Sequence, residues 1–228
     1  MEQQAHLSTL LETCSAAIGV RLQAEQLKQF MVYLEELQTW NRSINLTSIT
    51  SEEEIIVKHF VDSLACLTIE HIKQGASLLD VGTGAGFPGI PLKIVRPDLN
   101  ITLIEPVQKK VSFLYFIVGI LRLEQVKIFY GTLEQFMASS HCNRAYDYVT
   151  TRALQYNVLL QKGSSLVTDS GRAILYLSRS INRVELPNYW SVVAEQGFDL
   201  PMNFGQRSIT ILSISRMDSF NVPRGTLS

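Results

Sequence analysis

The spacing of apolar residues along the chain changes near residue 73. On the N-terminal side, apolar side chains recur every three or four positions, which places them on one face of a helix. Residues 23–40 carry the clearest stripe, made of Leu27, Phe30, Met31, Leu34 and Leu37. Residues 3–18 and 51–67 are also predicted to be helical. We therefore predict a helical cap over residues 1–72.

From residue 76 onward, short apolar runs alternate with helical segments. The predicted strands cover residues 76–81, 100–105, 126–130, 146–151, 171–177 and 207–214. The predicted helices cover residues 89–95, 107–122, 132–138 and 154–167. Strands separated by helices imply right-handed crossovers and a parallel sheet. We therefore predict an α/β fold whose doubly wound, mostly parallel sheet occupies residues 73–228.

Two segments of this region differ from the rest. Residues 111–121 are apolar on nearly every side, and this predicts a deeply buried helix. Residues 178–205 show no pattern that assigns them to an element.

A glycine-rich loop follows the first predicted strand. The strand ends in Asp80, and the loop carries Gly82, Gly84 and Gly86. Glycine tolerates positive φ and lets a phosphate or a sugar approach the backbone, where a Cβ would block it. This spacing directly after Asp80 is typical of methyltransferases that use S-adenosylmethionine. We interpret Asp80 as the residue that organises the N–H groups of the loop, with a direct cofactor contact as a second possibility.

A second register of the loop competes with the first. Residues 84–89 match the dinucleotide fingerprint G-x-G-x-x-G. That match starts four residues beyond Asp80, and it puts Pro88, which has no N–H, where a pyrophosphate needs a donor. The methyl-donor register is therefore favoured over a nicotinamide cofactor, which stays an alternative.

Two further positions support a cofactor site. Glu105 ends the second predicted strand, where a carboxylate can accept both hydroxyls of a ribose. Arg152 ends the fourth, and ligands bind at the carboxyl ends of parallel strands. Gly131 opens the turn after the third strand, where the adenine is expected.

Composition narrows the class of protein only slightly. The chain has 228 residues and a net charge of −1, with 20 Lys and Arg against 21 Asp and Glu. That balance argues against binding nucleic acid by charge alone. Its 3 Cys and 4 His show no disulfide or metal spacing. We expect a monomeric, cytoplasmic protein without a metal or a membrane anchor.

Four blocks of sequence resemble the RsmG family, also called GidB. The most specific is residues 80–94, whose Phe-Pro-Gly-Ile-Pro continuation extends the glycine loop. The others are residues 40–47, residues 57–64 and residues 146–153, where a serine is usual at Thr151. The resemblance implies a class I methyltransferase fold. It also implies an enzyme that transfers a methyl group from S-adenosylmethionine to guanine N7 in the 16S RNA of the small ribosomal subunit.

The resemblance also implies roles for individual residues. The glycine loop and the end of the second strand already predict cofactor contacts from Asp80, Gly82, Gly84, Gly86 and Glu105. The resemblance adds Phe87, Leu133, Glu134 and Arg152. Arg152 is expected near the methionine end of the cofactor or near the target nucleotide. Lys58 and His59 fall in a block that faces the same cleft, and His59 alone suggests a packing residue. Asn45, His59 and Arg152 are the candidates for contact with the reacting base.

The resemblance weakens after residue 166. The family usually has a Lys followed by a Gly-Gly turn near 167–171 and a Lys-Gly pair after the fifth strand, where this chain has Ser178 and Arg179. Either Arg172 and Arg179 supply these basic contacts, or the contacts to RNA are weaker in this chain. The alternatives are a methyltransferase acting on a protein or small molecule, a nicotinamide oxidoreductase and a non-enzymatic RNA-binding module.

Overall fold

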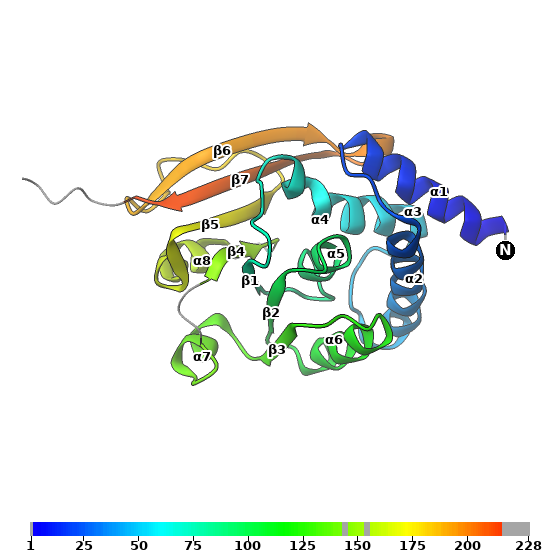
Figure 1. Cartoon of the computed structure of the whole chain (residues 1–228), viewed down its shortest axis with the longest axis horizontal. Helices are drawn as coiled ribbons and strands as arrows, with labels where there is room; N and C mark the ends of the chain where they lie inside the picture. The colour runs from blue at the N-terminus through cyan, green and yellow to red at the C-terminus, as the bar shows by residue number, and fades with distance from the viewer. Residues whose placement is uncertain (1, 143–145, 153–155, 216–228) are drawn as a thin grey trace, which may run out of the picture.

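The computed structural model contains one seven-stranded sheet covered by helices on both faces (Figure 1). It describes residues 2–142, 146–152 and 156–215. The strand order is β3-β2-β1-β4-β5-β7-β6. The first five strands run parallel, and β7 pairs antiparallel with both β5 and β6. The predicted fold class is confirmed.

The elements follow the predicted alternation closely. The strands are β1 (Ser77–Val81), β2 (Asn100–Glu105), β3 (Val126–Tyr130), β4 (Tyr146–Thr151), β5 (Val167–Leu177), β6 (Trp190–Asp199) and β7 (Gln206–Ile214). The α-helices are α1 (Glu2–Ala17), α2 (Ala24–Ile44), α3 (Glu52–Ile55), α4 (Asp62–Leu64), α5 (Gly89–Val95), α6 (Gln108–Ile120), α7 (Leu133–Ala138) and α8 (Tyr156–Lys162). A π-helix, η1 (Ile56–Val61), joins α3 to α4, and short 3₁₀ turns are η2 (Ala65–Thr68), η3 (Gly163–Leu166) and η4 (Pro201–Asn203).

Two apolar clusters hold the layers together. One joins α1, α2 and the α3–α4 segment to α5, α6 and one face of the sheet, and its largest members include Phe30, Tyr33 and Phe60. The other joins α7 and α8 to the opposite face. The N-terminal helices therefore share a core with the sheet, and a domain boundary at residue 72 stays a prediction.

Three sequence predictions need correction. The helix now called α6 is not deeply buried, because one side packs on β2, β3 and α2 while Tyr115 and Ile120 on its other side are exposed. At this end of the sheet no further layer covers it (Figure 1). The predicted helix 154–167 ends at Lys162, and β5 begins at Val167, not at residue 171. The first two residues of that predicted helix, and Ala153, lie outside the described residues.

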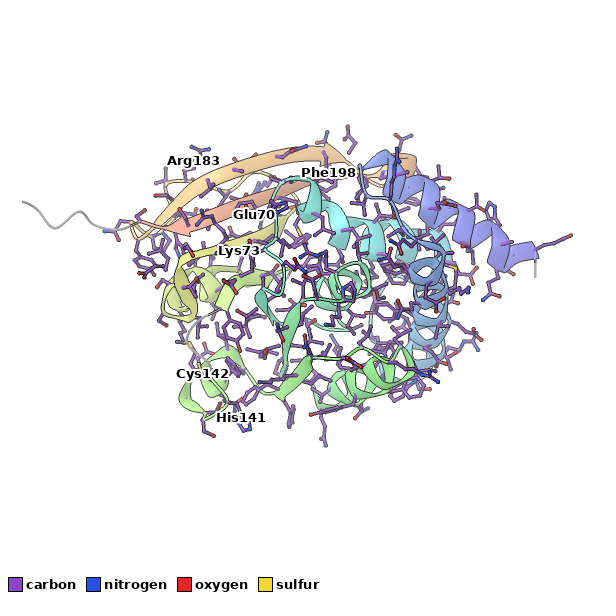
Figure 2. The ribbon with its side chains drawn as sticks, viewed as in Figure 1. Glu70, Lys73, His141, Cys142, Arg183 and Phe198 are labelled. Carbon is purple, nitrogen blue, oxygen red and sulfur yellow. The ribbon has the colours of Figure 1, made fainter. Side chains whose placement is uncertain are left out.

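The segment 178–205, which the pattern left unassigned, contains β6 and η4. Strand β6 lies at the edge of the sheet, so many of its side chains are only partly covered, and its burial pattern is irregular. Figure 2 places Arg183 beside β6 and Phe198 near the opposite end of the same strand. An edge strand without strict alternation is hard to recognise from sequence.

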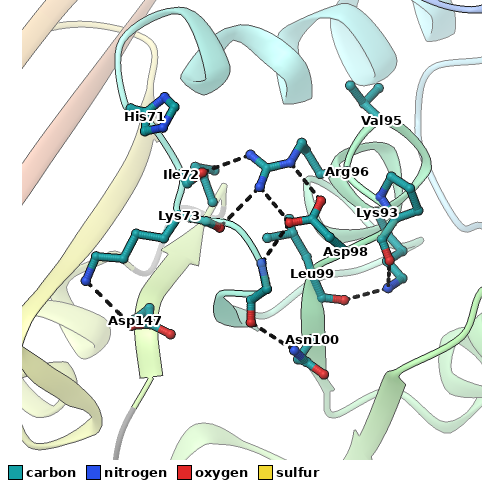
Figure 3. Close-up of polar contacts among 12 residues, drawn as sticks. His71, Ile72, Lys73, Lys93, Val95, Arg96, Asp98, Leu99, Asn100 and Asp147 are labelled. Carbon is teal, nitrogen blue, oxygen red and sulfur yellow. Dashed lines mark hydrogen bonds and ion pairs between the residues drawn. The ribbon is translucent and has the colours of Figure 1, made fainter.

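Polar contacts fasten the chain at the amino ends of the strands (Figure 3). Arg96 donates to the carbonyl of Ile72 at 2.9 Å and to both carboxylate oxygens of Asp98. Asp98 also accepts from the backbone N–H of Gly75 at 2.8 Å. The bonds from Arg96 hold the pKa of Asp98 well below its usual range. These contacts fix the entry to β1, and β1 in turn positions the glycine loop.

The cysteines are free thiols. Cys14 and Cys66 are buried, and Cys142 is partly exposed beside α7 (Figure 2). Burial raises the pKa of Cys66 to about 12. Within the described residues there is no group of three His, Cys, Asp or Glu that could hold a metal ion. No helix in that part of the chain is long and apolar enough to cross a membrane.

Candidate functional site

The glycine loop, residues 82–89, runs from the end of β1 to the start of α5. The N–H groups of Gly82 and Thr83 both donate to the carbonyl of Ile104 in β2, at 2.9 and 3.1 Å. Gly82 and Gly84 adopt φ angles of 69° and 63°, a region that strongly favours glycine. The loop is thus anchored on the neighbouring strand, and its conformation explains two of its glycines.

Asp80 organises the loop from beneath. Its Oδ2 atom accepts hydrogen bonds from the Thr83 hydroxyl at 2.6 Å and from the Gly89 N–H at 2.8 Å. The carboxyl group is fully buried, and Oδ1 has no hydrogen-bond partner among the described residues. Burial raises the pKa of Asp80 to about 6, although both hydrogen bonds act to lower it. These bonds agree with the organising role inferred from the sequence, and a cofactor contact stays a prediction.

Glu105 and Tyr33 also bind the glycine loop by hydrogen bonds. Glu105 accepts from the Gly84 N–H at 2.8 Å through Oε2 and from the Val107 N–H at 2.9 Å through Oε1. Each carboxylate oxygen keeps a second lone pair, so both can still accept a hydroxyl. On the other side, the Tyr33 hydroxyl of α2 donates to the Ala85 carbonyl. The loop is therefore held by side chains from three elements.

The glycines of the motif have different roles. A Cβ at Gly84 would meet no atom within 4 Å, so this residue borders open space. A Cβ at Gly86 would lie 2.5 Å from Ile90 Cδ1 and 2.8 Å from the Tyr33 hydroxyl. Gly86 is therefore required for packing, which is a reason the sequence spacing did not reveal. Its predicted contact with a cofactor stays a prediction.

Phe87 connects the loop to the π-helix η1. Its buried ring stacks on His59 with 4.5 Å between centroids and lies 5.5 Å from the ring of Tyr33. The guanidinium of Arg152 sits 4.9 Å from the centre of the same ring. Phe87 therefore packs against η1 through His59, against α2 through Tyr33 and against the end of β4 through Arg152. Its predicted cofactor contact stays a prediction.

Arg152, at the end of β4, is held by η1. Its Nη1 atom donates to the Lys58 carbonyl at 2.9 Å and to the His59 carbonyl at 3.3 Å. Its Nη2 atom lies 2.9 Å from Nδ1 of His59. The resemblance implied that Lys58, His59 and Arg152 face one cleft, and the structure brings all three together.

The partners of His59 determine its tautomer. A guanidinium only donates, so Nδ1 of His59 must accept from Arg152. The ring proton is then on Nε2, which lies 2.8 Å from the Thr47 hydroxyl and donates to it. Burial, followed by the charge of Arg152, holds the pKa of His59 well below its usual range. His59 is therefore neutral at pH 7, and its lone pair is already engaged.

A buried carboxylate joins Arg152 to the last strand. Oδ2 of Asp62 lies 3.3 Å from Nη1 of Arg152 and 3.6 Å from Nε of Arg207. Burial raises the pKa of Asp62, and the two arginines act against that shift. Arg207 reaches this place because β7 runs antiparallel to β5, which puts the start of β7 beside the end of β5.

A cleft of about 750 Å³ opens beside this cluster. It lies at the carboxyl ends of β4 and β5, where ligands bind in folds of this kind. Four cationic side chains line it: Lys58, Arg152, Arg179 and Arg207. The acids Asp62 and Glu185 and the polar residues Ser178, Ser180 and Asn182 also line it, so cations outnumber acids by four to two. The cleft suits an anionic ligand. Arg179 thus lies where a basic contact was predicted, whereas Arg172 is hydrogen-bonded to the carbonyls of Ser170 and Gly171.

The remaining predicted residues lie outside this cluster. Leu133 is buried at the start of α7. Glu134 forms an ion pair with Lys162 at 2.7 Å, and that contact lowers the pKa of Glu134 to about 2. Asn45 is exposed and caps α2 with a φ of 50°, so its position indicates a turn-forming role. Its contact with a base stays a prediction.

Four residues of the site were not predicted from the sequence. Tyr33 lies among the residues of the apolar stripe of α2 without having been named in it, although a tyrosine facing a core needs a partner for its hydroxyl. Asp62 and Thr47 belong to the resembling blocks without having been singled out. Arg207 was missed because its position depends on the antiparallel pairing of β7, which no local pattern indicates.

The fold and the loop together define the class of protein. A solved structure of TrmN from Thermus thermophilus is similar with a TM-score of 0.56 and 14% identity, over 68% of this chain and 48% of that one. A B. subtilis tRNA methyltransferase, TrmK, is similar with a TM-score of 0.53 and 13% identity, over 70% of this chain and 66% of that one. At such identities the likeness concerns the fold, which is that of the class I methyltransferases.

The family is established by closer relatives. Residues 26–204 match the family model GidB, described as rRNA small subunit methyltransferase G. Curated relatives named ribosomal RNA small subunit methyltransferase G include one from Oceanobacillus iheyensis, 34% identical over 90% of each chain. Another, from Alkaliphilus oremlandii, is 31% identical over 96% of this chain and 95% of its own. The chain belongs to this family of methyltransferases.

The two inner glycines provide a first test. Gly84→Ala is expected to lower the free energy of unfolding by about 1–2 kcal/mol, the cost of a left-handed backbone for alanine. Gly86→Ala adds collisions with Ile90 and Tyr33, so the loss should be about 3 kcal/mol or more. Urea denaturation of both variants measures the difference. Equal losses of unfolding free energy in the two variants would contradict the packing role of Gly86.

The buried Asp80 predicts a pH dependence. Its folded pKa of about 6 exceeds its ordinary value of 3.8, so its stabilising contribution is complete below pH 4 and is lost as pH rises through 6. Relative to Asp80→Asn, the wild-type chain should lose about 2–3 kcal/mol of unfolding free energy between pH 4 and 7.5. Urea denaturation of both proteins across this range measures it. A difference that is constant with pH contradicts the assignment.

Proposed function

We propose that this chain transfers a methyl group from S-adenosylmethionine to N7 of a guanine in 16S ribosomal RNA. The observation that supports this proposal most strongly is that Arg152 borders both the glycine loop and the cationic cleft. On one side it covers Phe87 of the glycine loop, and on the other it lines the cationic cleft. A donor held by the loop and an acceptor held in the cleft would therefore meet at Arg152.

The residues present fit the cofactor. Open space beside Gly84 leaves room for a ligand against the backbone, and Glu105 keeps lone pairs for two ribose hydroxyls. Val107 and Tyr130 are exposed apolar side chains near the carboxyl ends of β2 and β3, and they are candidate walls for an adenine. A related fold, TrmK from M. capricolum, was solved in complex with S-adenosylhomocysteine. When bound, S-adenosylmethionine supplies a methyl group activated by its sulfonium.

The chemistry at guanine N7 requires positioning and no base. That nitrogen has an in-plane lone pair and carries no proton, so no group must remove one. This agrees with His59, whose lone pair is engaged by Arg152 and whose pKa is held low. Orientation of two reactants can contribute on the order of 7–11 kcal/mol to a rate. Arg152 and Arg207 both lie within 3.6 Å of the Asp62 carboxylate, and the three side chains supply a fixed wall for that purpose.

The cleft supports an RNA substrate over a neutral one. Arg179 and Arg207 reach it from segments beside the end of β5, and phosphate groups are the usual partners of such arginines. The net charge of −1 means that this local positive charge, not the whole chain, must attract the RNA. A monomeric, cytoplasmic enzyme remains our expectation.

Methyl transfer to RNA tests the proposal directly. The chain is incubated with labelled S-adenosylmethionine and small ribosomal subunits from cells that lack this methylation, and the label is mapped by mass spectrometry. One methylated guanine N7 in 16S RNA is expected. Label on protein alone, or at another RNA atom, contradicts the proposal.

Two variants separate the donor and acceptor sites. Gly84→Val fills the open space and should weaken S-adenosylmethionine binding at least about tenfold, because the added atoms occupy the ligand's volume. Arg179→Gln should leave that affinity unchanged and reduce the salt dependence of RNA binding by about one phosphate contact. Calorimetry and filter binding measure the two effects. Loss of cofactor binding in Arg179→Gln would contradict the division.

A further inference from the structure

The helix α6 exposes an apolar surface that the proposed reaction does not use. We call it the α6 face and define it by Tyr115, Phe116 and Ile120, which are 61%, 37% and 44% exposed. They are three of the eight large hydrophobic residues that are exposed in the described part of the chain, and all three lie on one helix. Such clustering marks an interaction site, whereas scattered apolar residues do not.

The rings of the α6 face are held in place. Tyr115 donates its hydroxyl to the Ile128 carbonyl of β3 at 3.4 Å, which holds the ring against the open edge of that strand. The ring of Phe116 packs against Trp40 with 5.2 Å between ring centroids, and Trp40 packs on Phe113 with 5.6 Å between centroids. Aromatic rings fixed in this way lose little conformational freedom when a flat partner stacks on them.

The charged residues in the segment around the α6 face indicate the chemical class of its partner. Residues 107–130 contain four cations, Lys109, Lys110, Arg122 and Lys127, against the single acid Glu124. This segment is therefore positive in a chain whose net charge is −1. A second copy of the chain that docked through the same face would bring like charges together across the contact. A polyanion with flat bases matches both the cations and the rings.

We propose that the α6 face is a stacking platform for unpaired bases of the ribosomal RNA, a second contact away from the cleft. This inference rests on the proposed function, because it names a further part of the same substrate. The helix begins three residues after Glu105, at the carboxyl edge of β2. Strand β3 is separated from β7 by four strands, or about 24 Å from one to the other at the usual strand spacing. The two contacts therefore engage different nucleotides.

The test compares two substitutions at Tyr115. Tyr115→Phe keeps a ring that can stack, and Tyr115→Leu keeps apolar bulk without a π-face. Leucine should raise the dissociation constant for 16S RNA about tenfold, since stacking of one base contributes a factor of this order or more. Phenylalanine should stay within about twofold of the wild type, and both should bind S-adenosylmethionine normally. Val193→Ala, at an exposed apolar position on β6, is the control and should change nothing.

Two independent readouts accompany the affinities. Ultraviolet crosslinking of the wild-type complex should yield an RNA-bound peptide that contains Tyr115. Lys127→Gln should lower the slope of log K against log salt by about 0.7–0.9. Equal RNA affinity for leucine and wild type, or no crosslink in α6, overturns the inference. So does a wild-type dimer that Tyr115→Leu dissociates, because the face then binds a second copy.

Failure of this inference is distinguishable from failure of the proposed function. If the wild type methylates 16S RNA and Tyr115→Leu binds that RNA equally well, only the α6 platform is wrong. If the wild type places no label in 16S RNA, the proposed function itself fails. A variant that binds naked RNA normally and loses affinity only for a ribosomal protein overturns the platform in favour of a protein partner.

Discussion

Two buried carboxylates determine the shape of the glycine loop, and the site depends on that shape. Asp80 draws Thr83 and Gly89 toward the end of β1, and Glu105 draws Gly84 toward the end of β2. A charge-assisted bond to a backbone N–H is among the stronger hydrogen bonds of a protein. The loop is thus fixed on the neighbouring strands β1 and β2 before any ligand arrives. Such preorganisation is what a reaction that works by positioning requires.

Arg152 connects the glycine loop to the cleft that we propose holds the acceptor base. The guanidinium is bound by backbone carbonyls of η1, by His59 and by Asp62, so it cannot move independently of the π-helix. π-Helical turns are rare and are frequently found at functional sites. Here the turn brings carbonyls of consecutive residues to one arginine.

Much of the fold could be read from the sequence because its signals are local. β2, β3 and β4 begin and end where the apolar runs predict, since a buried parallel strand is a short continuous run bounded by turn residues. Strand β6 and the start of β5 were missed, because edge pairing depends on partners far along the chain. The prediction that α6 is deeply buried was wrong for a related reason. Composition alone cannot distinguish a central helix from one at the end of a sheet.

The candidate site divides in the same way. The glycine spacing, Glu105 and Arg152 were found from motif and strand position, whereas Tyr33, Asp62 and Arg207 become visible only when distant elements meet. Gly86 is the instructive residue, because its motif position suggested a ligand and its surroundings show a packing need. The motif located Gly86, but its packing against Ile90 and Tyr33 is visible only in the structure.

The most direct test of this account is a crystal structure of the chain with S-adenosylhomocysteine. The account predicts the ribose hydroxyls on the carboxylate of Glu105 and the ligand's backbone-facing edge in the open space at Gly84. Binding of the ligand in the cationic cleft beside Arg179 and Arg207, with the glycine loop free, would contradict it.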